Sequence, residues 1–215
     1  MFQVNHLNGF GAAGSGAAPK VLTYKGAARQ DTSGTVVTLS VDIGTASADR
    51  YVIVAVGGCT STRTVSSLTI AGVTATQIVA SSAAETSAIY MALVTSGSGA
   101  QNIVITWSGA QDVTGIGVWT LTGVSGTTPV DTKTSTANPF TATLSTVNGG
   151  VAVAYAMVTN TTTYTWTNLT EQFDTTAAGV GHSGAQDAAN TGASISITCT
   201  ASGYDSRSSM VAASW

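Results

Sequence analysis

The feature of this sequence that most constrains its fold is a long series of short segments in which β-branched or other apolar residues alternate with polar ones. In Thr35–Asp42, Val37, Leu39 and Val41 are separated by Thr and Ser. This period of two is typical of a strand with one buried face. Helical periodicity is almost absent, and clusters of Gly, Ser, Asn and Asp lie between the segments where turns are needed. The sequence therefore predicts an all-β protein.

Many short strands joined by small turn residues indicate a jelly-roll-like or Ig-like β-sandwich. The longest apolar runs, Tyr51–Val56 and Val151–Val158, have the length of strands and are too short to cross a membrane as a helix. The predicted strands are Val21–Lys25, Thr35–Asp42, Arg50–Val56, Val65–Ala71, Thr74–Val79, Ser87–Thr95, Asn102–Ser108, Thr114–Leu121, Phe140–Thr146, Gly150–Thr159, Thr163–Asn168, Ala178–Gln186, Ser194–Thr200 and Ser209–Trp215.

Two parts of the chain resemble each other, which indicates an internal duplication. Trp119 and Trp215 fall at matching places in this comparison. The matched stretches are VVTLSVDIGTASADRYVIVAVGG from Val36 with FTATLSTVNGGVAVAYAMV from Phe140, and NIVITWSGAQDVTGIGVWTL from Asn102 with SISITCTASGYDSRSSMVAASW from Ser194.

We therefore divide the chain into an extended N-terminal arm, residues 1–20, and a β-sandwich, residues 21–215. The sandwich consists of two similar halves, at about 35–125 and 140–215. Each half could form a small Ig-like sandwich, or the two could interleave into one larger sandwich. The shortness of the second half, and a closing strand at Trp215 that needs neighbours already in place, favour the interleaved sandwich.

Charged residues are scarce, at 8 % of the chain against the usual quarter, and the net charge is −3. Thr (37), Ser (24) and Gly (24) are abundant, while a hydrophobic content of 43 % argues against disorder. The 7 Lys and Arg residues form no basic stripe for nucleic acid. Such a hydroxyl-rich surface repels its own copies only weakly, which suits a protein that packs into an assembly.

Two short motifs resemble functional signatures but lack the context that those signatures need. Gly9–Gly14 matches G-x-G-x-x-G, but no strand precedes it, and Pro19 and a strand follow where a helix is required. Gly181–Ala185 (GHSGA) nearly matches the nucleophile elbow G-x-S-x-G, but it lies in an all-β chain. His182 and Ser183 are adjacent, so in a strand they point to opposite faces. We expect neither a dinucleotide site nor a serine hydrolase.

Acidic residues and metal ligands are too scattered to indicate a catalytic site. No spacing brings two carboxylates together for glycoside cleavage, and none matches a zinc or calcium pattern. We therefore expect no catalytic residue, no metal and no cofactor. Cys59 and Cys199 could form a disulfide, since both lie in or beside predicted strands; the alternative is two small buried thiols.

The N-terminal arm, MFQVNHLNGFGAAGSGAAPK, differs from the rest of the chain. It has neither the basic start nor the continuous apolar core of a signal peptide, so we expect it to remain on the mature protein. Phe2, Val4, Leu7 and Phe10 are spaced apolar anchors, and the Gly/Ala stretch after them adds reach with little bulk. This combination predicts an arm that docks into a groove or adds to the edge of a neighbouring sheet.

Nearly the whole chain resembles small β-sandwich virion proteins of tailed bacteriophages, and it is most similar to those of phages of α-proteobacteria. The resemblance lies in the order of strands and turns, and it carries over no functional residue. It implies a place on the virus particle, assembled in the bacterial host cytoplasm. The shared stretches are the GFGA start, VLTYKGAARQDTSGTVVTLSVDIGTASADRYVIVAVGG, SSLTIAGVTATQIV, IYMALVTSGSGAQNIVITWS, IGVWTLTGV, GGVAVAYAMV, TYTWTNLTEQFD and VAASW.

We therefore expect a non-enzymatic virion structural protein, either a capsid decoration or cement protein or a head spike. Its arm would attach it to the major capsid protein or another virion protein. We expect a homo-oligomer, for which a trimer would suit a capsid threefold axis or a spike, and no nucleic-acid or membrane partner. The alternative is a collar or tail-appendage module that binds host-surface glycans, with Trp166 or Tyr204 stacked on a sugar.

Overall fold

A computed structural model describes residues 18–60, 63–81, 85–160, 163–177, 179–203 and 207–215. These residues form an all-β structure of antiparallel sheets, as the alternating pattern predicts. Within them there is no helix, and therefore none long and apolar enough to span a membrane. Most of the N-terminal arm lies outside the described residues.

The strands fall into two series along the chain. The first series is β1 (Val21–Gln30), β2 (Gly34–Asp42), β3 (Tyr51–Gly58), β4 (Val65–Ile70), β5 (Val73–Thr74), β6 (Thr76–Ala80), β7 (Thr86–Leu93), β8 (Ala100–Gln111) and β9 (Thr114–Thr122). The second series is β10 (Asp131–Ser135), β11 (Phe140–Ser145), β12 (Gly150–Thr159), β13 (Tyr164–Thr167), β14 (Thr170–Ala177), β15 (Val180–Asn190), β16 (Ser194–Ala201) and β17 (Ser209–Ser214).

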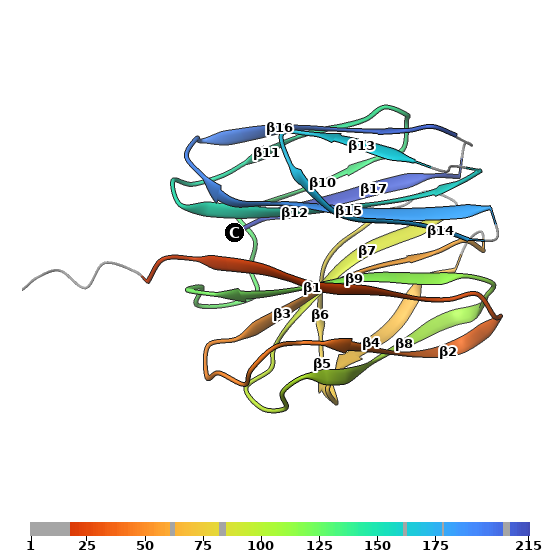
Figure 1. The fold of residues 1–215 in the computed structure, drawn as a ribbon, viewed down its shortest axis with the longest axis horizontal. Helices are drawn as coiled ribbons and strands as arrows, with labels where there is room; N and C mark the ends of the chain where they lie inside the picture. Colours follow the sequence, from red (N-terminus) through yellow and green to blue (C-terminus); the bar gives the residue numbers. More distant parts are fainter. Residues whose placement is uncertain (1–17, 61–62, 82–84, 161–162, 178, 204–206) are drawn as a thin grey trace, which may run out of the picture.

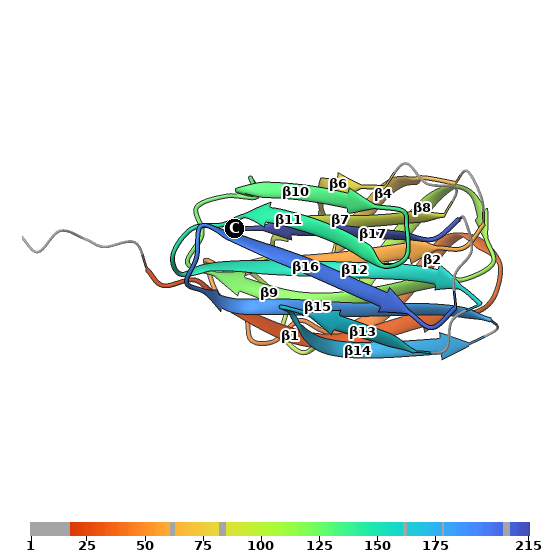
Figure 2. The ribbon, with the colours of Figure 1, turned by 90° about the horizontal axis from the view of Figure 1, so that it is seen from above.

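Four sheets are stacked face to face (Figure 1, with a second view in Figure 2). The first outer sheet has the order β2-β8-β4-β5 and packs on the first inner sheet, β1-β9-β3-β7-β6. The second inner sheet, β10-β17-β12-β15-β14, packs on the other face of the first inner sheet, and the second outer sheet, β11-β16-β13, covers it. Each half of the chain thus supplies one outer and one inner sheet.

The two halves repeat one strand order. When β1–β4 are matched with β10–β13, and β6–β9 with β14–β17, the inner sheets read identically and the outer sheets share β2-β8-β4 and β11-β16-β13. No described strand pairs with a strand of the other half, so the expectation of one interleaved sandwich was wrong. The physical reason is that the central strands β3 and β12 already have a partner on both sides within their own half.

Three apolar layers lie between the four sheets. One core, with Trp107 and Ile103, fills the first half, and another, with Phe140 and Ile197, fills the second. Strands β3 and β12 are buried on both faces because each lies between two cores, which explains their continuous apolar runs. The layer between the inner sheets, here called the seam, consists of Leu22, Tyr51, Ile53, Ala55, Ile89, Met91, Val113, Trp119, Leu121, Val151, Val153, Tyr155, Met157, Val180, Val211, Ala213 and Trp215.

Trp119 and Trp215 both lie in the seam, but they do not hold equivalent positions. Trp119 pairs with Ile53, the second seam-facing residue of β3. The main chain of Trp215 bonds that of Val151, the first seam-facing residue of β12. The predicted match is therefore wrong by two residues. The sequence comparison could not determine how many residues the turn before each closing strand contains.

Candidate functional site

Several residues that the sequence singled out cannot be placed. The arm residues Phe2, Val4, Leu7 and Phe10 lie outside the described residues, and so does Tyr204. Their roles stay predictions.

Trp166, the other aromatic residue considered for sugar stacking, lies in β13 of the second outer sheet. Its side chain is half-buried against the core of the second half. The indole Nε1–H donates a hydrogen bond of 2.8 Å to Ser183 Oγ. Trp166 therefore turns its polar edge inward, toward β15, and this arrangement gives the glycan-binding alternative little support.

Cys59 and Cys199 are both free thiols. Cys59 packs at the seam beyond the end of β3, whereas Cys199 is buried in the core of the second half. Burial raises the pKa of both thiols, and nearby carboxylates raise it further. Both are therefore protonated at neutral pH and are poor nucleophiles.

His182 and Ser183 point to opposite faces of β15, as their adjacency predicts. The His182 ring faces the seam, where it meets the rings of Phe173 and Tyr155. Ser183 Oγ faces the second outer sheet, where it accepts a hydrogen bond from Trp166. The GHSGA stretch therefore does not bring a nucleophile and a base together.

Large side chains of the second half fill hollows that glycines leave in the first half. A Cβ atom on Gly57 would lie 2.5 Å from Met157 Sδ and 2.6 Å from Tyr155 Oη. A Cβ on Gly115 would lie 2.7 Å from the His182 ring. These separations are shorter than carbon atoms tolerate, so β3 and β9 need glycine here for the inner sheets to approach each other.

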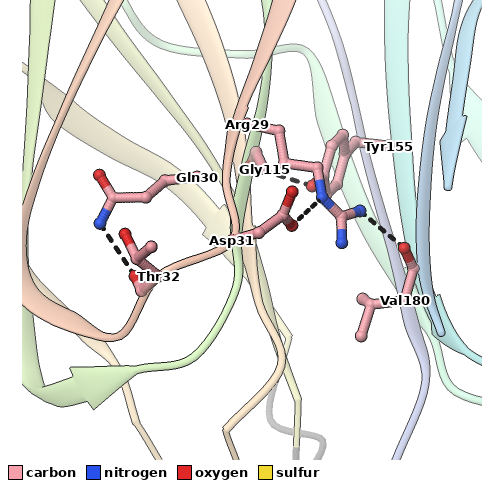
Figure 3. Close-up of polar contacts among 7 residues, drawn as sticks. All are labelled: Arg29, Gln30, Asp31, Thr32, Gly115, Tyr155 and Val180. Atoms are coloured by element: carbon pink, nitrogen blue, oxygen red, sulfur yellow. Dashed lines mark hydrogen bonds and ion pairs between the residues drawn. The ribbon is translucent and has the colours of Figure 1, made fainter. Parts of the chain in front are cut away.

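Polar contacts cross the seam at one end of the stack (Figure 3). Arg29 Nη1 donates a hydrogen bond of 2.6 Å to the carbonyl oxygen of Val180, and its Nε contacts the carboxylate of Asp31. Tyr155 Oη donates to the carbonyl oxygen of Gly115 at 3.1 Å. Burial raises the pKa of the Tyr155 phenol, so it remains a donor at every physiological pH. These bonds join β1 and β9 of the first half to the second inner sheet.

A second polar group crosses the seam between the loop before β7 and the start of β17. Arg207 Nε lies 3.9 Å from Glu85 Oε1, and the Glu85 side chain is completely buried. Ser209 Oγ donates to Ser87 Oγ at 2.8 Å and accepts from Ser81 Oγ at 3.2 Å. A buried carboxylate is tolerated when a cation lies beside it, so this group ties the halves together at a defined register.

Two side chains that face the seam, His182 and Trp119, have buried nitrogen atoms without a hydrogen-bond partner among the described residues. The His182 side chain is fully buried, and this holds for both of its ring nitrogens. Burial, together with the nearby Arg29 cation, lowers the pKa of His182 to about 3. The ring is therefore neutral at physiological pH and packs as an aromatic side chain.

A cleft of about 720 Å³ opens at the end of the molecule where the chain enters β1, here called the arm-side end. Ala18, Lys20 and Trp215 are among the residues that line it. Its other lining residues are Asp49, Gly123, Val124, Ser125, Gly126, Thr128 and Val130. Trp215 Nε1 donates to the carbonyl oxygen of Thr127 at 3.3 Å, which holds the 123–130 connection between the halves against the seam.

Exposed apolar side chains gather at the arm-side end. Among the described residues, six large hydrophobic side chains are exposed, and the other two, Val36 and Val73, belong to the first outer sheet. The four at the arm-side end are Val21, Leu93, Val130 and Val147. Val21 begins β1, and Leu93 ends β7 opposite Tyr51 at the start of β3. Val130 bonds the main chain of Ser214 just before β10, and Val147 bonds that of Gly150 at the start of β12.

The described residues contain no group of three His, Cys, Asp or Glu side chains placed to hold a metal ion. The polar groups of the seam instead link one half to the other. Comparison of the chain with protein-family models, with curated proteins and with solved structures found no match.

Proposed function

We propose that this protein is a non-enzymatic structural protein of a bacteriophage particle, a capsid decoration or cement protein or a head spike. Its N-terminal arm attaches it to the major capsid protein or to another virion protein. The observation that carries the proposal is the arm-side end: the described residues just before β1, Ala18 and Lys20, line an open cleft, and four exposed apolar side chains lie at the same end. An arm with apolar anchors, rooted on an apolar surface, is suited to attachment.

The exposed face of the second outer sheet supports the same role. Every residue that β11, β13 and β16 turn outward is Ser or Thr, and none is charged. Such a face can be covered by a neighbouring protein without taking a charge out of water. The residues are Thr141, Thr143, Ser145, Thr165, Thr167, Ser194, Ser196, Thr198 and Thr200.

The proposal is tested by measuring incorporation into particles by quantitative mass spectrometry. We expect deletion of residues 1–17 to abolish incorporation while the sandwich stays folded. Val130→Asp should reduce it about tenfold, equivalent to about 1.4 kcal/mol of attachment free energy. Val36→Asp is the matched control, because it places the same charge on the exposed first outer sheet. Normal incorporation of the truncated protein contradicts the proposal.

A further inference from the structure

The seam is the layer that can open without dismantling either half. Each half has its own core between its outer and inner sheets, and no described strand is shared between halves. Separation at the seam would expose the layer around Trp119 and Tyr155 but leave both of these cores closed. A side chain that controls the opening of the seam therefore controls whether the two halves stay packed against each other.

Among the residues that face the seam, His182 is the one least able to accept a proton while the seam is closed. Its ring lies over Gly115, where a Cβ would be only 2.7 Å away, so there is no room for water between ring and strand. The Phe173 and Tyr155 rings, centred 5.5 and 6.0 Å away, flank it from β14 and β12. Both ring nitrogens lack a hydrogen-bond partner among the described residues. An imidazolium here would have two buried N–H groups and no acceptor.

The charged groups around His182 do not offset such a proton. From β1, the Arg29 cation faces the ring and opposes its protonation, and Asp31, which favours it, is in contact with Arg29. From β12 come Tyr155 and the neighbouring Met157, and β14 supplies Phe173 and Thr175, all uncharged. β9 contributes Gly115.

The two carboxylates of β14, those of Glu171 and Asp174, lie on the face of the sheet opposite His182. Asp174 Oδ2 accepts a hydrogen bond from the main-chain N–H of Tyr164 in the second outer sheet. Glu171 and Asp174 both act on Cys199, in the core of the second half. A proton on His182 would therefore place a second buried cation beside Arg29.

We propose that His182 is an acid-sensitive latch: its protonation opens the seam between the two halves while the core within each half stays folded. This device goes beyond the proposed role in a virion and does not depend on it. The open state binds the proton because the ring regains water, so acid favours opening. The open state binds one more proton than the closed state. The equilibrium constant for opening therefore rises about tenfold for each pH unit below about 6.5, the ordinary pKa of histidine.

The test is the rate of methionine oxidation by hydrogen peroxide in the full chain between pH 6 and pH 4, measured by mass spectrometry. Opening of the seam exposes side chains but breaks no strand pairing, because every described strand pair lies within one half. In the wild type, the oxidation rates of Met91 and Met157, which are buried in the seam, should rise about tenfold per pH unit. Met210, which is buried in the core of the second half, should keep its slow rate. His182→Phe and His182→Gln should remove the slope, and either variant suffices if the other fails to fold.

Asp174→Asn is the matched control, because it removes a titrating carboxylate of the same sheet on its other face and keeps an oxygen for the Tyr164 N–H. It should show the wild-type slope. The inference is overturned if the His182 variants and the wild type share one slope, if no slope occurs in the wild type, or if the oxidation rate of Met210 rises together with those of Met91 and Met157.

Discussion

Tyr155 of the second half donates a hydrogen bond to the main-chain carbonyl of Gly115 in the first half, and it reaches that carbonyl across a surface left open by glycines. The bond is 3.1 Å long and fully buried. It shows how the four-sheet stack is joined. Polar atoms and bulky side chains of one inner sheet are accommodated by positions of the other inner sheet that carry no side chain.

Tyr155→Phe should lower the free energy of unfolding by roughly 1–3 kcal/mol, because it leaves the buried Gly115 carbonyl without this donor. Urea unfolding measures the change. Tyr90→Phe is the control, since Tyr90 bonds Gln77 within the first half. It should cost less because that bond is only partly buried. Equal stability of Tyr155→Phe and the wild type would show that the cross-seam bond contributes nothing.

Gly115→Ala should destabilise the protein by roughly 1–3 kcal/mol, because the added methyl group would overlap the His182 ring. Thermal unfolding gives the comparison. Gly126→Ala provides the reference, since nothing lies within 4 Å of a Cβ at that position. If the two alanine variants were equally stable, the inner sheets would not depend on glycine for their close approach.

Arg50→Lys should cost roughly 2–4 kcal/mol although it keeps the charge. The buried Arg50 guanidinium donates to the carbonyl oxygens of Ile43, Gly44, Val94, Ser96 and Gly97. A lysine has three N–H donors, so it cannot bond all five carbonyls. Denaturant unfolding tests this, and full retention of stability would mean that these loops do not need the guanidinium.

Acid should lower the free energy of unfolding through the protonation of His182. The pKa of His182 is lowered in the folded state, so its contribution to stability is complete above about pH 6.5 and is lost as the pH falls toward 3. Between pH 6.5 and pH 4 the loss is roughly 3 kcal/mol. Urea titrations of wild type and His182→Gln at several pH values give the difference, in which the carboxylates cancel. A difference that does not change with pH would contradict this account.

The fold class follows from the alternating pattern, but the edge strands do not. The predicted strands include neither β10 (DTKTS) nor any part of β14 (TEQFDTTA). Both are edge strands with one partner, so they need not alternate apolar and polar residues. The stacking of two complete sandwiches was also hidden, because an apolar run such as Tyr51–Val56 shows only that both faces are covered, not by which half.

The residues of the seam were the hardest to anticipate. Gly57 and Gly58 suggest a turn, yet both lie inside β3, where Gly57 faces Tyr155 and Met157. A glycine that makes room for a neighbour looks the same in sequence as a glycine that turns the chain. His182 was singled out by the GHSGA motif, but its burial depends on strands distant in sequence, which no local pattern reveals.

The most direct test of the central claim is the copy number of this protein in purified phage particles, measured by quantitative mass spectrometry against the major capsid protein. The proposed decoration or cement role predicts a ratio near one or a simple fraction of it. A handful of copies per particle would point instead to a collar or tail appendage. Absence of the protein from the particle would contradict the virion assignment itself.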